Sequence, residues 1–261
     1  MSENAPTDHD EQDSMKKRTT VDADLEQESG EWQFDEEVAR QFDDHVRKSI
    51  PLYDHIQSQV LNITDWFLQA SGGEHVYDLG CATGTTIQRF VERYGPTSPP
   101  KFTGIDVQAP MLEKARERVG EHPNVSLVQA DISTHMSFPN ATVVTSLFTM
   151  SFVRESERQR LISQIYDDLE HGGAFIFVEK TRARSPFFQD IWNQEYWDFK
   201  ARQDLSAEAI LGKAQTLRGQ LRPLTIPEYE EMLSTAGFDT EQNVDIFFKW
   251  YPWTGIVARK T

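Results

Sequence analysis

Two amphipathic helices are predicted near the start of the chain. Apolar side chains recur every four residues between 34 and 48, which is the spacing of one helix face: Phe34, Val38, Phe42 and Val46. Proline disfavours helix in the residue before it, so we expect a break at Ser49-Ile50-Pro51. A second helix is expected from about Leu52 to Ala70, with a buried stripe of Ile56, Val60, Ile63 and Phe67.

Short β-rich runs then alternate with longer helical ones from residue 75 to residue 180. The expected strands are 75–79, 101–106, 125–130, 142–147 and 174–180. Helices are expected between them at about 84–94, 109–120 and 155–170, with His171-Gly172-Gly173 as the carboxyl-terminal cap of the last one. This alternation is typical of a parallel sheet with helices on both faces.

Residues 181–224 do not fit the alternation. This segment is aromatic and basic; it contains Phe187, Phe188, Trp192, Tyr196, Trp197 and Phe199 together with Arg182, Arg184, Lys200, Arg202, Arg218 and Arg222. We interpret it as a helical lid inserted over an active site. For most of these aromatic side chains, taken one at a time, filling a core beneath the lid is the simpler role.

The end of the chain predicts a hairpin. A helix is expected at 226–236, capped by Gly237, and two apolar runs follow it around a tight turn at Tyr251-Pro252-Trp253. Such a short connection requires antiparallel neighbours. The predicted fold class is therefore α/β: a Rossmann-like, seven-stranded, mostly parallel sheet with an antiparallel last strand, helices on both faces, amino-terminal helices and a helical lid.

Composition narrows the function classes. The 261 residues carry a formal net charge of −16, which repels a polyphosphate backbone and disfavours broad nucleic-acid binding. No apolar run approaches the length of a membrane-spanning helix and the amino terminus is acidic, which predicts a cytoplasmic protein with no membrane partner. Residues 1–31 lack a hydrophobic period and are predicted to form a disordered acidic tail before one domain at 32–261.

The strongest chemical signal is YDLGCATG at 77–84, a strand that ends in an acid and a glycine-punctuated turn. Its two glycines allow the backbone to turn sharply and to approach a ligand closely, which implies a nucleotide-like cofactor. The dinucleotide fingerprint would place glycines at 80, 82 and 85, whereas this chain has Ala82 and Thr85. In addition, the carboxylate of Asp78 would lie beside an anionic pyrophosphate, which is unfavourable.

S-adenosyl-L-methionine suits this turn better, because it carries an ammonium and a sulfonium and has no phosphate. We expect the Asp78 region to receive its amino-acid end, while backbone groups at Gly80 and Cys81 line it. Asp106, at the end of the second strand, is placed to accept hydrogen bonds from the ribose hydroxyls. Asp131-Ile132, after the third strand, is placed for adenine, and helix capping by Asp131 is an equally good alternative.

Other reactive residues are weaker candidates. The single cysteine, Cys81, excludes an internal disulfide and is interpreted as a small packing residue rather than a nucleophile. The seven histidines show no metal-ligand spacing, so no metal is expected. His45 and His55 lie on the amino-terminal helices, where a solvated face is the favoured role for each and a general base is the alternative.

These residues resemble the class I S-adenosylmethionine-dependent methyltransferases, and within them the branch that contains carboxy-S-adenosylmethionine synthase. The likeness extends from about Phe34 to Lys260 and rests on FDEEVARQFDDHVRKSIPLY, VYDLGCATG, FTMSFVRESERQ and the closing hairpin. It implies that Tyr53 approaches the cofactor and that Val107 and Leu147 line its site. The full set of cofactor-binding candidates is Tyr53, Asp78, Gly80, Cys81, Ala82, Gly84, Asp106, Val107, Asp131, Ile132 and Leu147.

Two positions depart from the synthase that the chain resembles. Leu147 stands where the synthase has an asparagine. An ungapped alignment through Phe199-Lys200 and Lys213 puts Ala214 where a lid arginine binds the extra carboxylate of the synthase's product. An alanine cannot form that charge-assisted pair, although Arg218 lies one helical turn later.

We therefore predict an S-adenosylmethionine-dependent methyltransferase that acts on a small molecule enclosed by the lid, by in-line displacement at the sulfonium methyl. No catalytic residue is assigned; the candidates for positioning the acceptor are Tyr53, Tyr196, Arg218 and Tyr251. The alternatives are carboxy-S-adenosylmethionine synthesis from the cofactor and prephenate, serving wobble-uridine modification in tRNA, a non-catalytic cofactor sensor, and a dehydrogenase. The sequence leaves the acceptor and the oligomeric state open, with a homodimer among the options.

Overall fold

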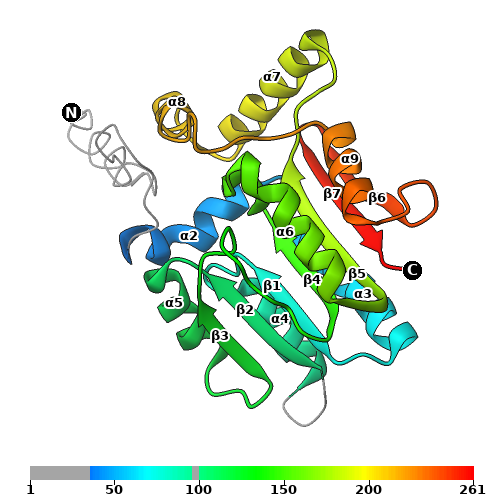
Figure 1. Cartoon of the computed structure of the whole chain (residues 1–261). Coiled ribbons are helices and arrows are strands. Elements are labelled where there is room, and N and C mark those ends of the chain that lie inside the picture. Colours follow the sequence, from blue (N-terminus) through cyan, green and yellow to red (C-terminus); the bar gives the residue numbers. More distant parts are fainter. Residues whose placement is uncertain (1–35, 96–99) are drawn as a thin grey trace, which may run out of the picture.

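A seven-stranded sheet forms the centre of the molecule (Figure 1). The computed structural model describes residues 36–95 and 100–261, so the predicted acidic tail and Phe34 lie outside the described residues. The strands are β1 His75–Leu79, β2 Lys101–Asp106, β3 Val125–Gln129, β4 Ala141–Leu147, β5 Leu169–Lys180, β6 Val244–Trp250 and β7 Trp253–Arg259. Their order is β3-β2-β1-β4-β5-β7-β6, and β7 runs antiparallel to both neighbours, which confirms the predicted fold class.

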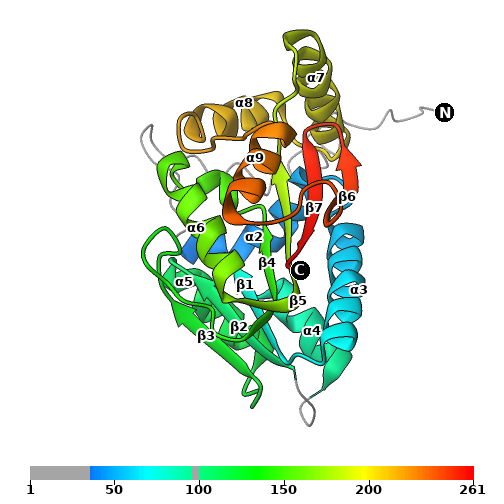
Figure 2. The same cartoon turned by 45° about the vertical axis from the view of Figure 1, so that its right-hand side comes forward.

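Helices cover both faces of the sheet (Figure 2). The helices of the described residues are α2 Glu36–Ser49, α3 Tyr53–Ser71, α4 Thr85–Tyr94, α5 Ala109–Val119, α6 Glu155–Asp168, α7 Pro186–Arg202, α8 Ala207–Thr216 and α9 Ile226–Ala236. Alternate strand residues separate the two layers: Val143 and Ile176 pack with α3, α4 and α5, whereas Val144 and Phe177 pack with α6 and α9. Both strand faces are therefore buried, as in other parallel sheets.

The lid predicted at 181–224 consists of α7 and α8, which project beyond the carboxyl ends of the strands (Figures 1 and 2). α2 also lies at this end, where it packs against α5 and α3. The amino-terminal helix α2 and the lid helices α7 and α8 thus lie together at the carboxyl ends of the strands. No helix in the described part of the chain is long and apolar enough to cross a membrane.

The end of α6 differs from the prediction. The helix stops at Asp168 and β5 begins at Leu169, so His171-Gly172-Gly173 lies within β5 and the predicted cap is wrong. Leu169 is extended and pairs with Ala141 of β4, and this long-range contact decides where the helix ends. β5 therefore begins five residues before the strand predicted at 174–180, whereas the elements expected between 52 and 236 other than α6 and β5 agree with the structure to within two residues.

The buried face of α3 is rotated from the expected stripe. Ile56 and Val60 are fully buried, as predicted, but Leu68 replaces Phe67 on the inner side and Ile63 is only partly buried.

The hairpin prediction is confirmed, because Tyr251 and Pro252 alone connect β6 to β7.

Candidate active site

A cavity of about 810 Å³ opens at the carboxyl ends of the strands, beneath α2, α7 and α8. Ligands of open α/β sheets bind at this edge. Its lining runs from Val38 of α2 to Trp253 of β7, so segments from both ends of the chain build it. Every cofactor-binding candidate except Gly84 lines the cavity.

The two glycines of the 77–84 turn serve contacts within the protein. Gly80 has a φ of 73°, and a Cβ there would lie 2.2 Å from Thr149 Oγ1. Gly84 has a φ of 77° and lies behind the cavity, where a Cβ would lie 3.0 Å from Ala115 Cβ. The close approach predicted from these glycines is therefore made to Thr149 and to α5 in this structure.

Asp78 is a buried carboxylate at the end of β1, with 2% of its surface exposed. Thr145 Oγ1 donates to its Oδ1 at 2.8 Å, whereas Oδ2 has no hydrogen-bond partner among the described residues. Burial, reinforced by the charge of Asp106, raises the pKa of Asp78 to about 7. The orphaned oxygen belongs to a cavity-lining residue and is suited to a cationic donor.

Asp106 holds the glycine turn as well as facing the cavity. The backbone N–H of Ala82 donates to Oδ2 at 2.9 Å and that of Gln108 donates to Oδ1 at 2.9 Å. Burial nevertheless raises its pKa above the ordinary value. Each carboxylate oxygen can accept a second hydrogen bond, so Asp106 retains capacity for a pair of hydroxyls.

The third acid in the series, Asp131, is exposed and caps the turn that follows β3. Its Oδ1 accepts a hydrogen bond from Ser133 N at 2.8 Å, which realises the capping alternative. It still lines the cavity beside buried Ile132 and half-exposed Val107. These two aliphatic side chains offer apolar contact to a flat ring.

Four further candidates line the same cavity. Tyr53, at the start of α3, accepts a hydrogen bond from Gln57 Nε2 at 3.2 Å, and burial raises the pKa of its phenol. Cys81 is buried, and burial raises the pKa of its thiol well above the ordinary value, so the thiol stays protonated. Ala82 and Leu147 line the wall.

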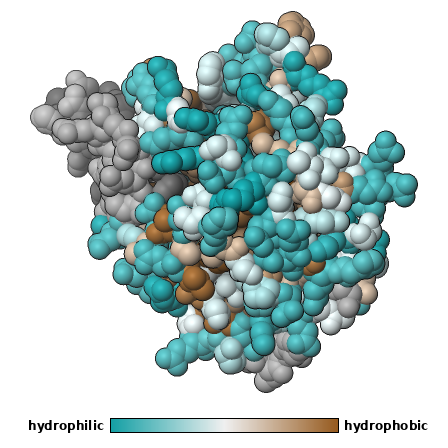
Figure 3. Space-filling view, viewed as in Figure 1, coloured by the Kyte–Doolittle hydropathy of each residue, from teal (hydrophilic) through white to brown (hydrophobic). Residues whose placement is uncertain are grey.

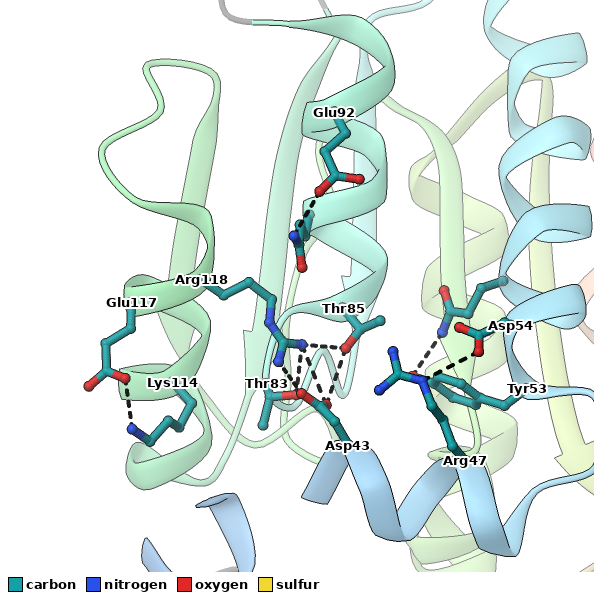
Figure 4. Close-up of polar contacts among 12 residues, drawn as sticks. Asp43, Arg47, Tyr53, Asp54, Thr83, Thr85, Glu92, Lys114, Glu117 and Arg118 are labelled. Atoms are coloured by element: carbon teal, nitrogen blue, oxygen red, sulfur yellow. Dashed lines mark hydrogen bonds and ion pairs between the residues drawn. The ribbon is translucent and has the colours of Figure 1, made fainter. Parts of the chain in front are cut away.

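A polar network joins α2 to the glycine turn and to α5 (Figure 4). Asp43 of α2 accepts hydrogen bonds from Thr83 Oγ1 at 2.7 Å and from Thr85 Oγ1 at 3.3 Å. Arg118 of α5 forms an ion pair with Asp43 and donates to Thr85. We call these four residues the Asp43 network; sequence reasoning missed it because its members lie far apart in the chain.

The two amino-terminal histidines have different surroundings. His45 is 7% exposed, lines the cavity and has its Nε2 3.1 Å from Ser49 Oγ. The predicted solvated face is therefore wrong for His45, because α2 lies across the cavity and turns this side of the helix inward. His55 is exposed, as predicted.

The acceptor candidates are not all brought together. Tyr196 and Arg218 line the cavity, and the Tyr196 hydroxyl donates to Ser49 O at 2.9 Å, which ties α7 to the end of α2. Tyr251 does not line it: this residue occupies the β6–β7 turn with a φ of 41°, and its ring packs on Trp250. The turn geometry points Tyr251 away from the site predicted for it.

Two cavity residues at the end of β5, Glu179 and Lys180, are absent from the sequence-based candidates. Glu179 accepts hydrogen bonds from Met150 N at 2.6 Å and from Ser151 N at 3.1 Å, so it fixes the 3₁₀ helix η2 (Met150–Phe152). Burial raises the pKa of Glu179 to about 7. The sequence pattern that could have identified them is an apolar strand that ends in polar residues, as at Asp78.

The residues at this end of the cavity fit S-adenosyl-L-methionine. The unpartnered Oδ2 of Asp78 matches an ammonium, Asp106 matches a ribose diol, and Val107 with Ile132 matches an adenine ring. The described residues contain no group of three or more histidine, cysteine or acidic side chains arranged to hold a metal ion.

Comparison with known proteins agrees with this fit. Residues 76–173 match a family model described as a methyltransferase domain. A carboxy-S-adenosyl-L-methionine synthase from Methylococcus capsulatus is 36% identical over 230 residues, which cover 87% of this chain and 93% of that protein. A synthase of the same name from Staphylococcus epidermidis is 33% identical, with coverage of 88% and 97%.

Solved structures show the same fold. Human N-acetylserotonin methyltransferase in complex with SAM superposes with a TM-score of 0.58 at 17% identity, covering 95% of this chain and 65% of that one. The DhpI–SAH complex superposes with a TM-score of 0.54 at 13% identity, covering 86% and 92%.

Fold, site and relatives together define a class I S-adenosyl-L-methionine-dependent methyltransferase, and S-adenosyl-L-methionine is its cofactor. Within this class the chain belongs to the family of carboxy-S-adenosyl-L-methionine synthase, whose members it matches along nearly their whole length.

Proposed function

We propose that the protein transfers the methyl group of S-adenosyl-L-methionine to a small molecule held beneath α7 and α8. The observation that carries this proposal is Ala214 of α8, which lines the cavity. The ungapped alignment puts Ala214 where the synthase that the chain resembles uses an arginine to bind an extra carboxylate. A methyl side chain offers no donor for that carboxylate, which favours the unmodified cofactor.

The cavity's residues would contribute binding, orientation and exclusion of water. Asp78 and Asp106 supply acceptors at the cofactor end, and the cofactor, when bound, supplies an electrophilic methyl group on sulfonium. Tyr196 and Trp253, whose rings pack edge to face with centroids 5.9 Å apart, form an apolar wall toward the lid. Alignment of the acceptor in a site without bulk water lowers the barrier to displacement.

Carboxy-S-adenosyl-L-methionine synthesis is the second candidate. It is favoured by the 36% identity to a relative of that name, and by Arg218, a cation that lines the cavity just beyond Ala214. On this alternative, Arg218 would bind the extra carboxylate, which Ala214 cannot bind.

Product analysis separates the two functions. The full-length protein is incubated with S-adenosyl-L-methionine and either prephenate or size-fractionated small molecules from a cell extract, and products are identified by mass spectrometry. We expect S-adenosylhomocysteine with at least one extract fraction, and no carboxylated sulfonium with prephenate.

Two results would contradict methyl transfer. A carboxylated sulfonium formed by the wild-type protein would establish the second candidate. Absence of S-adenosylhomocysteine with every fraction, while that compound itself binds, would support a cofactor sensor. Ala214→Arg is the matched variant: by restoring the donor, it is expected to favour binding of a carboxylated cofactor over the unmodified one.

A further inference from the structure

The side of the cavity formed by α3 and β7 holds two neutral polar atoms that lack a hydrogen-bond partner among the described residues. They are Oε1 of Gln57, a residue that is 1% exposed, and Nε1 of Trp253, a residue that is 7% exposed. Both residues line the cavity. Buried polar groups are normally hydrogen-bonded, and one without a partner costs free energy. A ligand in the cavity can supply the two missing partners.

The two atoms require opposite partners. Gln57 Nε2 donates to the Tyr53 hydroxyl at 3.2 Å, so the nitrogen of the amide is already directed to a partner one helical turn away. The remaining atom, the amide oxygen, can only accept, and it therefore needs a group with an N–H or O–H bond. The indole nitrogen of Trp253 can only donate, so it needs an acceptor.

A row of aromatic rings lies between the two residues. The ring centroid of Phe148 lies 5.9 Å from that of Tyr53, which holds Gln57, and 5.4 Å from that of Trp253. All of these residues line the cavity. Aromatic rings pack favourably against the rings of other planar groups. A small planar molecule on the Phe148 ring would thus have Tyr53 on one side and Trp253 on the other.

This side of the cavity differs from the end that fits the cofactor. Asp78 and Asp106 belong to β1 and β2, whereas α3 packs against β4 and β5 and Trp253 begins β7. In the sheet, β4 separates β1 from β5 and β7. The two unpartnered atoms are therefore placed for a molecule other than the cofactor.

We infer that Gln57 and Trp253 select the second substrate, a planar molecule that donates a hydrogen bond to Gln57 Oε1 and accepts one from Trp253 Nε1. Both protein groups are neutral, so the part of the substrate that they recognise needs no charge. Aromatic amides, lactams and other flat molecules that carry both N–H and C=O groups belong to this class. The inference rests on the proposed function, because it names the substrate class of the same cavity.

Three probes of nearly equal shape test the two hydrogen bonds. Benzamide has a donor and an acceptor, acetophenone has the acceptor alone, and α-methylstyrene has neither. Each is titrated onto the full-length protein saturated with S-adenosylhomocysteine, and binding is followed by ligand-observed NMR. We expect affinity to fall about fivefold from benzamide to acetophenone, and about fivefold again to α-methylstyrene. A merely apolar cavity would give the reverse order, because α-methylstyrene is the most apolar of the three.

Two conservative variants assign each hydrogen bond to its residue. Gln57→Met keeps the length of the side chain and removes the amide, so benzamide is expected to bind no better than acetophenone. Trp253→Phe keeps an aromatic ring and removes the N–H donor, so acetophenone is expected to bind no better than α-methylstyrene. Binding of S-adenosylhomocysteine with wild-type affinity shows that each variant is folded.

Gln59→Met is the matched control. Gln59 lies on the same helix and its Oε1 also lacks a hydrogen-bond partner among the described residues, but it does not line the cavity. This variant is expected to leave the order and the affinities of the three probes unchanged.

Three outcomes would overturn the inference. Benzamide does not bind the wild-type protein more tightly than α-methylstyrene; Gln57→Met and Gln59→Met change the preference for benzamide equally; or Gln57→Met weakens S-adenosylhomocysteine as strongly as benzamide, in which case Gln57 serves the cofactor. The titration needs no turnover. Selective binding that depends on Gln57 and Trp253, in a protein that transfers no methyl group, would therefore contradict only the proposed function.

Discussion

We expect Asp78 to affect the free protein and the cofactor complex in opposite directions. Its pKa in the folded protein, about 7, lies above the ordinary value of 3.8. Between these values the folded protein binds a proton that the unfolded chain releases, so the free energy of unfolding falls as pH rises through this window. A cation at Oδ2 favours the charged carboxylate, so cofactor binding is expected to strengthen over the same range.

Asp78→Asn should separate these effects. The variant removes the titration, so the unliganded protein is expected to gain more stability relative to wild type at about pH 8 than at about pH 5. S-adenosylhomocysteine binding should weaken about tenfold to a hundredfold, as for loss of a charged hydrogen-bond partner. Thermal unfolding and calorimetry at both pH values measure the two effects.

An exposed carboxylate on β6, Asp245, supplies the control for this prediction. Asp245→Asn is expected to change neither the pH trend nor the affinity. If wild type and Asp78→Asn showed the same pH trend, Asp78 would not be the group that titrates.

Among the elements, α2 is joined to the 77–84 glycine turn through the Asp43 network. Burial acts to raise the pKa of Asp43, but hydrogen bonds from Arg118 and Thr83 outweigh it and hold this pKa below its ordinary value of 3.8. The charged carboxylate therefore stabilises the fold at neutral pH, and this contribution is lost as pH falls below about 4. We expect this contribution to help hold α2 over the cavity.

Asp43→Asn is expected to lower the free energy of unfolding by about 1–3 kcal/mol and to weaken S-adenosylhomocysteine binding. Urea denaturation at neutral pH and calorimetry provide the measurements. The comparison variant is Asp54→Asn, because Asp54 forms ion pairs with Arg47 and Arg89 while its side chain is 56% exposed; about 0–1 kcal/mol is expected there. Unchanged cofactor affinity in Asp43→Asn would show that the contact of α2 with the 77–84 glycine turn does not contribute to cofactor binding.

The elements were largely predictable because their periods are local. β1 and β2 carry apolar runs that end in polar residues, and this places Asp78 and Asp106 at the cavity without knowledge of the fold. Long-range contacts decide the remainder. Pairing of Leu169 with Ala141 sets the end of α6, and the orientation of α2 decides that His45 faces inward.

At the scale of the whole molecule, the excess of negative charge lowers the stability of the folded state. The net charge is −16, and the face seen in Figure 3 is mostly hydrophilic. Mutual repulsion of like charges destabilises the folded state, and salt screens it. The melting temperature should therefore rise by about 2–5 °C when sodium chloride is raised from about 0.05 M to about 0.5 M.

The same salt series near pH 4.8, the isoelectric point of the sequence, serves as the reference. There the net charge is small and salt should change the melting temperature little. A rise of equal size at both pH values would point to preferential exclusion of the salt rather than screening.

Construction of the cavity from residues as far apart as Val38 and Trp253 bears on how the protein matures. A nascent polypeptide has no complete binding site until β7 has left the ribosome, because β7 supplies part of the wall. Ligands stabilise only the state that binds them. Metabolites in the cell would thus protect molecules that contain β7 and leave chains terminated before it to proteases, so ligand occupancy would distinguish the two.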